Sequence, residues 1–376
     1  MKLYIIAGEA SGDLHGSDLI RELKGILHQT EIRAWGGDLM EKEGAIIVKH
    51  YRDLAFMGFT EVVMNLRTIL NNMKFCKEDI TSFRPDAVIL IDYPGFNLRI
   101  ASFVKSLGIP VYYYISPQVW AWKESRVKKI KETVDKMFVI LPFETDFYKK
   151  FNYDVEYVGH PLPDVIRNSR KKFSDKSIFI KQHGLSGKPI IALLPGSRRQ
   201  EIQRILPLML SAEKKFPGYQ FVIAGAPSLP VSYYKNFIQG STAIVTGLTY
   251  ELLNHSHAAL VTSGTATLET ALLNVPEVVC YKGEKINYLI ARQLIKIKFI
   301  SLVNLIMDRE VVKELIQDEL NSVNIISELK NILQTSNRER IFKDYSQLQY
   351  LLSAGGAANK TATAIASDLN SRAISK

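Results

Sequence analysis

The chain has 376 residues and a formal net charge of +10 at pH 7, with 48 Lys and Arg against 38 Asp and Glu. Hydrophobic residues make up 47% and charged residues 23%, which excludes a disordered, collagen-like or coiled-coil protein. This length predicts two domains of similar size. The two cysteines, Cys76 and Cys280, lie far apart, which excludes a disulfide scaffold and a cysteine-built metal site and is typical of a reducing cytoplasm.

The sequence predicts neither a secretory signal nor a membrane-spanning helix. The first apolar run, 3–7, is short and ends at Gly8, and no stretch of about 20 apolar residues follows. The positive excess lies in small clusters at 126–131 and 167–172. A solvated surface, an anionic membrane and nucleic acid are the three interpretations. Nucleic acid is the least favoured, because no nucleic-acid-binding signature accompanies the charge.

Short apolar runs alternate with amphipathic segments along the chain. The runs are rich in β-branched and aromatic residues and predict strands at 3–7, 87–92, 109–115, 136–141 and 155–158. The segments between them predict helices near 15–28, 61–75, 97–107, 123–133 and 142–151. The pattern then restarts, with strands predicted at 188–194, 220–224, 243–245, 258–262 and 277–281. After Asn304 the chain is predicted to be wholly helical, near 309–320, 324–333 and 338–353 and in a final helix.

This alternation predicts parallel sheets with right-handed crossovers. Two such sets in series indicate an α/β fold of two Rossmann-like domains with a cleft between them. The boundary follows the segment 158–163, so the domains are predicted at 1–165 and 166–344.

Ligands of open parallel sheets bind beyond the carboxyl ends of the strands, so the loops after the strands contain the candidate site residues. After the first strand, glycines stand at 8, 12 and 16, a spacing that disfavours a dinucleotide site. Ser11 and Gly12 could approach a sugar or phosphate closely. The alternative is a capped turn, with Ser11 or Asp13 as N-cap.

Two more loops of the first half carry candidate residues. Asp92 ends the strand 87–92, where its carboxylate could act as a general base toward a bound hydroxyl. The alternative role for Asp92 is to cap the helix that starts near Asn97. Trp120, in the loop 116–122, could stack on the apolar face of a sugar or pack between the domains.

Two strand–turn–helix segments in the second half are suited to an anion. The first ends the strand 188–194 and contains Gly196, Ser197 and Arg198. Its backbone N–H groups and guanidinium could bind phosphate, or it could be a capped turn with solvated arginines. The second contains Ser263, Gly264, Thr265 and Ala266. Glu269 follows them and could accept hydrogen bonds from ribose hydroxyls. Together the two segments favour a nucleotide diphosphate.

Several catalytic and metal-binding patterns are absent from the sequence. It contains no D-x-D pair, H-E-x-x-H, P-loop or G-x-S-x-G motif. His160, His255 and His257 lack metal-ligand company and are interpreted as structural. The phosphate charge is therefore expected to be met by helix dipoles and arginine, with no metal or other cofactor.

An apolar stretch lies between residues 56 and 75. Its apolar side chains are Phe56, Met57, Phe59, Val62, Val63, Leu66, Ile69, Leu70 and Met73. They fit a core-facing amphipathic helix, or a face that enters a lipid surface or receives acyl chains.

In their order along the chain, these motifs resemble the lipid-A-disaccharide synthase family, which has the two-Rossmann GT-B fold. The matching segments are 7–13, 116–122, 158–161, 193–198, 263–269 and 309–315. The resemblance implies inverting transfer of 2,3-diacylglucosamine from UDP-2,3-diacylglucosamine to the 6-hydroxyl of 2,3-diacylglucosamine 1-phosphate (lipid X). The products are the β-1,6-linked disaccharide 1-phosphate and UDP.

The resemblance also implies residue roles. Asp92 is the base, Arg198 faces the phosphates and Glu269 faces the ribose. Asn304, after a strand at 299–302, lines the donor site. The stretch 56–75 receives acyl chains or contacts the inner leaflet of the inner membrane, where the enzyme is peripheral. The C-terminal helices, about 345–376, return to the first domain, and homodimers form by exchange of such segments.

This chain departs from the family pattern at two positions. Gly95 replaces a second acid of many members, and Val303 replaces the usual proline before Asn304. Two other functions fit the same motifs. One is a UDP-N-acetylglucosamine 2-epimerase-like enzyme, for which we find no convincing carboxylate–histidine set, and the other is a non-catalytic nucleotide-binding protein of the membrane surface.

Overall fold

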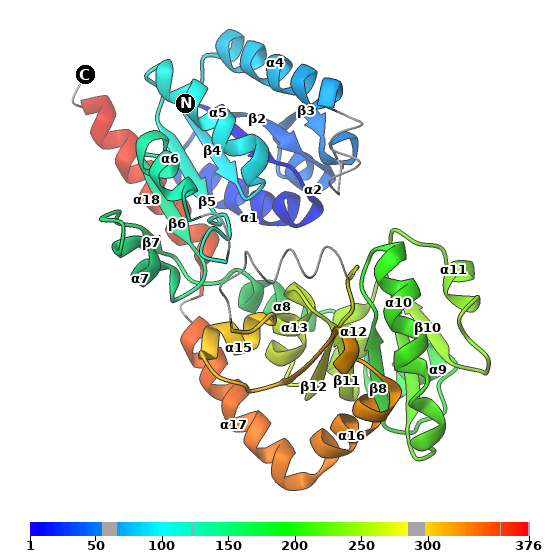
Figure 1. Ribbon diagram of the computed structural model, residues 1–376. Helices are drawn as coiled ribbons and strands as arrows, with labels where there is room; N and C mark the ends of the chain where they lie inside the picture. Colours follow the sequence, from blue (N-terminus) through cyan, green and yellow to red (C-terminus); the bar gives the residue numbers. More distant parts are fainter. Residues whose placement is uncertain (55–65, 122–123, 285–297, 354, 375–376) are drawn as a thin grey trace. The chain divides into compact units, whose positions relative to one another are not determined.

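The computed structural model describes residues 1–54, 66–121, 124–284, 298–353 and 355–374 (Figure 1). The chain forms two compact units. The first combines Met1–Pro161 with Ala354–Lys376, and the second is Leu162–Ser353. Within the described ranges, no helix is both long and apolar enough to cross a membrane.

The first unit is a parallel sheet with helices on both faces. Its strands are β1 (Lys2–Ala7), β2 (Glu31–Gly36), β3 (Ile46–His50), β4 (Ala87–Ile91), β5 (Val111–Tyr114), β6 (Lys136–Val139) and β7 (Glu156–Tyr157). Its helices are α1 (Ala10–Ile26), α2 (Asp38–Lys42), α4 (Leu66–Phe83), α5 (Pro94–Ser106), α6 (Arg126–Thr133), α7 (Glu144–Lys149) and α18 (Ala357–Ile374). The described strands are all paired in parallel, in the order β3-β2-β1-β4-β5-β6-β7.

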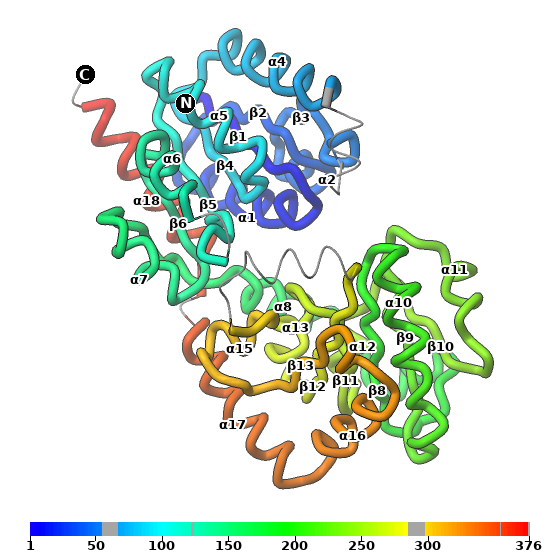
Figure 2. The backbone as a smooth tube through the Cα atoms, in the orientation of Figure 1, coloured from blue at the N-terminus to red at the C-terminus, as the bar shows by residue number. Residues whose placement is uncertain are grey.

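The alternation of side chains along each strand divides this sheet's core into two layers. Ile6 and Leu90 point to the face covered by α4, α5 and α6. Ile5 and Ile89 point to the other face, covered by α1 and α18. Helix α18, red in Figures 1 and 2, packs beside α1 although it ends the chain. Tyr112 of β5 fixes it by donating a 2.6 Å hydrogen bond to Asp368.

The second unit repeats this plan. Its strands are β8 (Ile190–Leu194), β9 (Gln220–Gly225), β10 (Ala243–Thr246), β11 (Ser256–Thr262), β12 (Glu277–Tyr281) and β13 (Lys313–Ile316). Its helices are α8 (Leu162–Arg170), α9 (Lys176–Gln182), α10 (Arg199–Leu210), α11 (Val231–Lys235), α12 (Thr249–Asn254), α13 (Thr265–Leu272), α15 (Leu302–Met307), α16 (Ser322–Leu333) and α17 (Thr335–Leu352). The described strands are again all parallel, in the order β10-β9-β8-β11-β12-β13.

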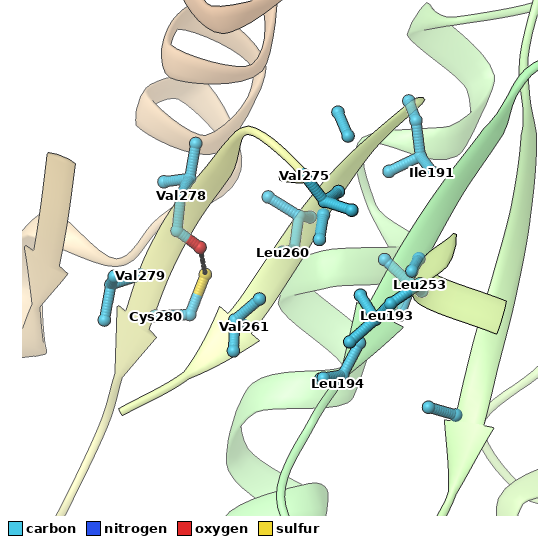
Figure 3. Close-up of a cluster of buried hydrophobic side chains, with 14 of the residues drawn as sticks. Ile191, Leu193, Leu194, Leu253, Leu260, Val261, Val275, Val278, Val279 and Cys280 are labelled. Carbon is cyan, nitrogen blue, oxygen red and sulfur yellow. Dashed lines mark hydrogen bonds between the residues drawn. The ribbon is translucent and has the colours of Figure 1, made fainter. Parts of the chain in front are cut away.

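The core of the second unit lies around its central strands. Figure 3 shows Leu193 of β8, Leu260 and Val261 of β11 and Val278 of β12 in one cluster of buried side chains. These strands are apolar on both faces because helices cover both, as expected of a parallel sheet. Burial also raises the pKa of the Cys280 thiol, which behaves as a small apolar side chain in this core.

The predicted fold class is confirmed, and most predicted strands lie within a few residues of the observed ones. Two strands of the first unit, β2 and β3, were not predicted. Strand β2 contains charged Arg33, whose guanidinium pairs with Asp79 of α4 at 2.6 Å and lies 4.9 Å from the Phe83 ring centre. Tertiary contacts on α4 therefore stabilise a charged residue in a strand, which the local pattern does not reveal.

Two predictions near the end of the second unit were wrong. Residues 299–302 are not a strand, because helix α15 begins at Leu302, where the Ser301 side chain accepts a hydrogen bond from Asn304 N. The chain after Asn304 is not wholly helical, because Lys313–Ile316 form the edge strand β13 beside β12. The return to the first unit also begins later than predicted, since α17 belongs to the second unit and α18 to the first.

Candidate functional site

Both sheets have the Rossmann strand order, which reverses direction between β1 and β4 in the first unit and between β8 and β11 in the second. Ligands of such sheets bind at the carboxyl ends of the strands on either side of this point. The segments after these four strands contain Ser11, in the first turn of α1, and Asp92, Arg198 and Gly264, in the loops after β4, β8 and β11. The fold therefore gives each unit its own candidate site, and we describe the two separately.

A pocket of about 470 Å³ lies at the reversal point of the second unit. It is lined by Leu194, Gly196, Ser197, Arg198, Glu201, Ala224, Ala226, Pro227, Thr249, Thr262, Ser263, Gly264, Thr265, Ala266 and Glu269. The two segments predicted to bind an anion thus lie in one pocket, at the N-termini of α10 and α13. Backbone N–H groups at helix N-termini carry partial positive charge, so this wall of the pocket is suited to phosphate.

Two glycines shape this wall by adopting left-handed backbone conformations. Gly196 has φ 101°, and a Cβ there would lie 2.6 Å from Glu201 Oε2. Gly264, which precedes α13, has φ 128° and ψ −158°, a region open essentially to glycine alone. Each glycine therefore turns the chain sharply from a strand into the first turn of a helix.

Substituting Gly264 with Ala is expected to lower the free energy of unfolding by about 1–3 kcal/mol, because φ 128° strains any residue with a Cβ. Urea unfolding measures the effect. Gly218→Ala is the control, because Gly218 lacks a positive φ and a Cβ at this position would meet open space. Equal stability of the two variants would contradict the strained turn.

Arg198 and Glu269 are two of the charged side chains that line the pocket. Arg198 is 62% exposed, and its Nη1 lies 3.5 Å from Glu201 Oε1, a weak surface pair that a bound anion could replace. Glu269 accepts a 2.7 Å hydrogen bond from the Tyr250 hydroxyl. Burial raises the pKa of Glu269, and the Tyr250 bond partly offsets that rise.

The floor of the pocket has an unmet hydrogen-bonding group. Thr262 Oγ1 is buried and has no hydrogen-bond partner among the described residues. A second chamber of about 470 Å³, lined by 247–251, Ser169 of α8, Lys172 and Phe173, shares Pro227, Thr249 and Glu269 with the first. The two chambers together could hold an elongated ligand with an anionic end and a less polar end.

Asn304 lies outside this lining. It is wholly buried, its Oδ1 accepts from Val311 N and Val312 N, and its Nδ2 donates to Val312 O and Glu314. These bonds occupy both N–H donors of Nδ2 and both lone pairs of Oδ1 with partners inside the protein. Asn304 therefore belongs to a buried hydrogen-bond network and is not among the residues that line the pocket. Its predicted place in the donor site stays a prediction.

The reversal point of the first unit places Asp92 in a strained turn. Asp92 has φ 44° and Tyr93 φ 49°, two consecutive left-handed residues that are not glycine. The Asp92 carbonyl accepts hydrogen bonds from the Tyr113 hydroxyl and from Asn97 Nδ2, which hold this conformation. Strain of this kind is concentrated at functional sites.

The Asp92 carboxyl is only partly exposed, and its environment favours the protonated form. Burial raises its pKa to about 6, with a further contribution from the negative charge of Glu9. Glu9 lies at the start of α1, after the neighbouring strand β1. The Tyr93 ring packs against Gly8, where a Cβ would lie 2.4 Å from the ring. The structure thus brings the loops after β1 and β4 together.

The other predicted residues of the loop after β1 differ in exposure. Ser11 is exposed, whereas Gly12 is buried, and a Cβ at Gly12 would lie 3.0 Å from the Ala7 Cβ. Neither Ser11 nor Asp13 is the N-cap, because α1 begins at Ala10 after Glu9. Asp13 is 2% exposed and instead accepts hydrogen bonds from backbone N–H groups at the start of α2.

Trp120 lies in the first unit, partly buried, with its ring edge-on to Phe143 at 4.9 Å. Next to Phe143, Glu144 is 1% exposed and accepts hydrogen bonds from Ile140 N and Leu141 N. Burial raises the pKa of Glu144 to about 7, although its hydrogen bonds act in the opposite direction.

The described part of the apolar stretch 56–75 lies in α4. Met73 is 8% exposed and packs in the core, whereas Leu70 is 55% exposed and Phe75 43% exposed. Ile69 is partly buried. Phe56, Met57, Phe59, Val62 and Val63 lie outside the described residues, and so does the side chain of Leu66.

Glu9, Tyr250 and Thr262 were not singled out from the sequence. Glu9 and Thr262 each adjoin a predicted loop, so position at a strand end was a usable signal. Tyr250 lies 19 residues before Glu269 in another helix, and only the fold brings the two together.

The chain is similar to known proteins along nearly its whole length. A family model described as lipid-A-disaccharide synthetase matches residues 3–367. The lipid-A-disaccharide synthase of Syntrophus aciditrophicus (strain SB) is 41% identical over 371 residues, which cover 96% of each chain. That of Myxococcus xanthus (strain DK1622) is 36% identical, over 97% of this chain and 96% of the relative.

Solved structures show the same fold at low sequence identity. The UDP-GlcNAc 2-epimerase of Neisseria meningitidis, bound to UDP-GlcNAc, matches with a TM-score of 0.68 at 14% identity, over 97% of this chain and 99% of that one. A calicheamicin glycosyltransferase matches with a TM-score of 0.59 at 15% identity, over 97% of each chain. The GT-B architecture is thus shared by enzymes of different activity, and identity along the full length is what separates them. On that basis the chain belongs to the lipid-A-disaccharide synthase family and is a glycosyltransferase of lipid A biosynthesis.

Proposed function

We propose that the chain transfers 2,3-diacylglucosamine from UDP-2,3-diacylglucosamine to the 6-hydroxyl of lipid X, with inversion at the anomeric carbon. The observation that carries this proposal is the pocket in which two glycine-led helix starts, Arg198 and Glu269 face one space. A uridine diphosphate offers two phosphates and two ribose hydroxyls, which correspond to these groups.

In this proposal the second unit binds the donor. The pyrophosphate lies at the N-termini of α10 and α13, near Ser197, Ser263 and Thr265. Arg198 leaves Glu201 to pair with the phosphates, and Glu269 accepts from the ribose hydroxyls. The chamber lined by 247–251 receives the uracil ring. Arginine and helix N-termini then stabilise the charge that develops on the departing UDP, without a metal ion.

In the first unit, Asp92 acts as the general base. Its carboxylate takes the proton of the acceptor 6-hydroxyl as that oxygen attacks the anomeric carbon. The bond from the anomeric carbon to the UDP oxygen breaks, and UDP leaves with the electron pair. A base with a pKa of about 6 is ionised at neutral pH and still able to accept a proton, which suits this role.

The acyl chains of both substrates need an apolar surface. Leu70 and Phe75 on α4 are exposed, and Arg67 and Lys74 lie on the same helix. A helix face with apolar and basic side chains fits a surface with acyl chains and anionic head groups. We therefore propose that α4 belongs to a peripheral contact with the inner leaflet of the inner membrane. The homodimer stays a prediction.

A UDP-release assay in detergent, with a chelator, tests the proposed reaction. We expect release only when both acylated substrates are present. Release of UDP from the donor alone would contradict transfer to an acceptor. Isomerisation of unacylated UDP-N-acetylglucosamine would favour the epimerase activity, and UDP binding without turnover would favour a non-catalytic role.

Glu9→Gln is expected to move the acidic limb of the kcat/KM profile to lower pH by about half a unit, because it removes a negative charge that raises the Asp92 pKa. Initial rates between pH 4.5 and 8 measure the shift. Glu31→Gln, a charge-matched change at the amino end of β2, is the control and should leave the limb unmoved. An unmoved limb in Glu9→Gln would argue against Asp92 as the titrating base.

A further inference from the structure

Glu314, on the edge strand β13, is a buried carboxyl that has no part in the proposed reaction. It is 7% exposed and does not line the pocket. Its Oε2 accepts from Ile300 N at 3.0 Å, and its Oε1 accepts from Ser301 N at 3.0 Å and from Asn304 Nδ2 at 2.9 Å. A carboxylate has the lone pairs for all three N–H donors, and burial without them would be costly.

Asn304 extends this network to the loop that precedes β13. Its Oδ1 accepts from Val311 N at 2.7 Å and from Val312 N at 3.0 Å, while its Nδ2 donates to Val312 O at 2.8 Å. Glu314 and Asn304 therefore connect the start of α15 to the loop and strand that follow it. These hydrogen bonds tie the backbone of the 300–304 segment to the loop and strand that follow it.

The network reaches the pocket through the Ile300–Ser301 peptide. Its N–H, from Ser301, donates to Glu314, and its carbonyl, Ile300 O, accepts a 3.4 Å hydrogen bond from Ser263 Oγ. Ser263 lines the pocket and directly precedes Gly264, the glycine that starts α13. Helix α13 also packs against α15. The Ser263 hydroxyl is thus hydrogen-bonded to the carbonyl of the Ile300–Ser301 peptide, and the N–H of the same peptide is hydrogen-bonded to Glu314.

The environment of the neighbouring acid Glu277 differs from that of Glu314. It is fully buried at the start of β12, and neither carboxyl oxygen has a hydrogen-bond partner among the described residues. Burial raises the Glu277 pKa well above its ordinary value, and the nearby Glu314 raises it further. Burial therefore favours the protonated form of Glu277, whereas three N–H donors face the carboxyl group of Glu314.

From this arrangement we infer that Glu314 is a positioning residue for donor binding: through the Ile300–Ser301 peptide it fixes Ser263 and the phosphate-binding turn at the start of α13. The inference rests on the proposed function, because it assumes that the pocket binds UDP. It assigns Asn304 a supporting role in the same network. It also separates binding of the donor from binding of the acceptor, which the proposal assigns to the first unit.

Glu314→Gln tests the inference. The side-chain amide of Gln carries N–H donors at a position where Glu314 accepts hydrogen bonds from N–H groups, so two donors would face each other. We expect the Kd for UDP, measured by calorimetry well below the Tm of each variant, to rise about tenfold or more, and the acceptor KM to stay unchanged. Glu310→Gln is the matched control on the same segment. Its carboxyl is 54% exposed and pairs with Lys313 at 3.5 Å, so UDP binding should not change.

Glu314→Asp keeps the charge but draws it back by one methylene, and we expect a Kd for UDP about threefold above wild type. This variant decides the question if Glu314→Gln does not fold. A folded Glu314 variant with the wild-type Kd, or one whose acceptor KM rises in parallel, would overturn the positioning role. Failure of the wild-type protein to bind UDP would overturn the proposed donor pocket, and the inference with it.

Discussion

Asp92→Asn is expected to lower kcat/KM by about 10³-fold and, at pH 8, to raise the free energy of unfolding by about 2–3 kcal/mol. Activity falls because an amide cannot take the acceptor proton. The fold is preserved, because the Tyr113 and Asn97 hydrogen bonds go to the Asp92 carbonyl, which the variant keeps. Asparagine also tolerates the left-handed conformation at φ 44°.

The gain in stability follows from linkage. In the folded protein the Asp92 pKa is raised from 3.8 to about 6, so the native state binds this proton more tightly than the unfolded chain. Ionisation of Asp92 therefore lowers stability as the pH rises from about 4 to 6, and the cost persists above that. Asn, which does not ionise, avoids that cost.

Urea unfolding at pH 4 and pH 8, together with the UDP-release assay, measures both effects. The difference in stability between Asp92→Asn and wild type should be present at pH 8 and vanish near pH 4. Asp154→Asn, an exposed position before β7, is the control and should change neither quantity. A folded Asp92→Asn variant with wild-type activity would remove Asp92 from the mechanism.

Arg198→Ala is expected to lower kcat/KM by about 10²- to 10³-fold, because Arg198 carries the positive side chain proposed to face the UDP phosphates. Stability should hardly change, since the side chain is 62% exposed and its pair with Glu201 spans 3.5 Å. Arg198→Lys should recover part of the loss, because it keeps the charge without the planar fork.

The adjacent Arg199 provides a matched control for Arg198. Its guanidinium lies 5.0 Å from the centre of the Tyr233 ring, and it does not line the pocket. Arg199→Ala should therefore keep the donor KM and kcat while losing a few tenths of a kcal/mol of stability. Steady-state kinetics and Tm measurements on both variants test this contrast. Similar losses of activity in both would indicate a general effect of positive charge.

The residues of the donor pocket were accessible from the sequence because they follow strands. Gly196 and Gly264 each stand one or two residues beyond an apolar run and before a helix, and a parallel sheet gathers all such turns at one edge. Tyr250 and Glu314 were not accessible in this way. Each acts through a residue distant in sequence, and its partner is known only once the helices are packed.

The strand β13 shows why part of the fold was mispredicted. Its sequence, Lys-Glu-Leu-Ile, has the composition of a helix, and the strand conformation is fixed by pairing with β12 and by the bonds that Glu314 receives. Strand β2 is similar, since Arg33 is stabilised by Asp79 on α4. In both segments a charged residue lies in a strand because it contacts another part of the chain. Arg33 pairs with Asp79, and Glu314 accepts hydrogen bonds from Ile300 N and Ser301 N. Local strand propensity does not include the energy of these contacts.

The place of α18 in the first unit has a consequence for biosynthesis. The ribosome makes β1 to β7 first, yet Ile365, Ala366 and Leu369 of α18, which cover one face of their sheet together with α1, follow the second unit in the sequence. The part of that face covered by α18 stays uncovered while the whole second unit is translated. The first unit therefore completes its core only after the second unit and α18 have been synthesised.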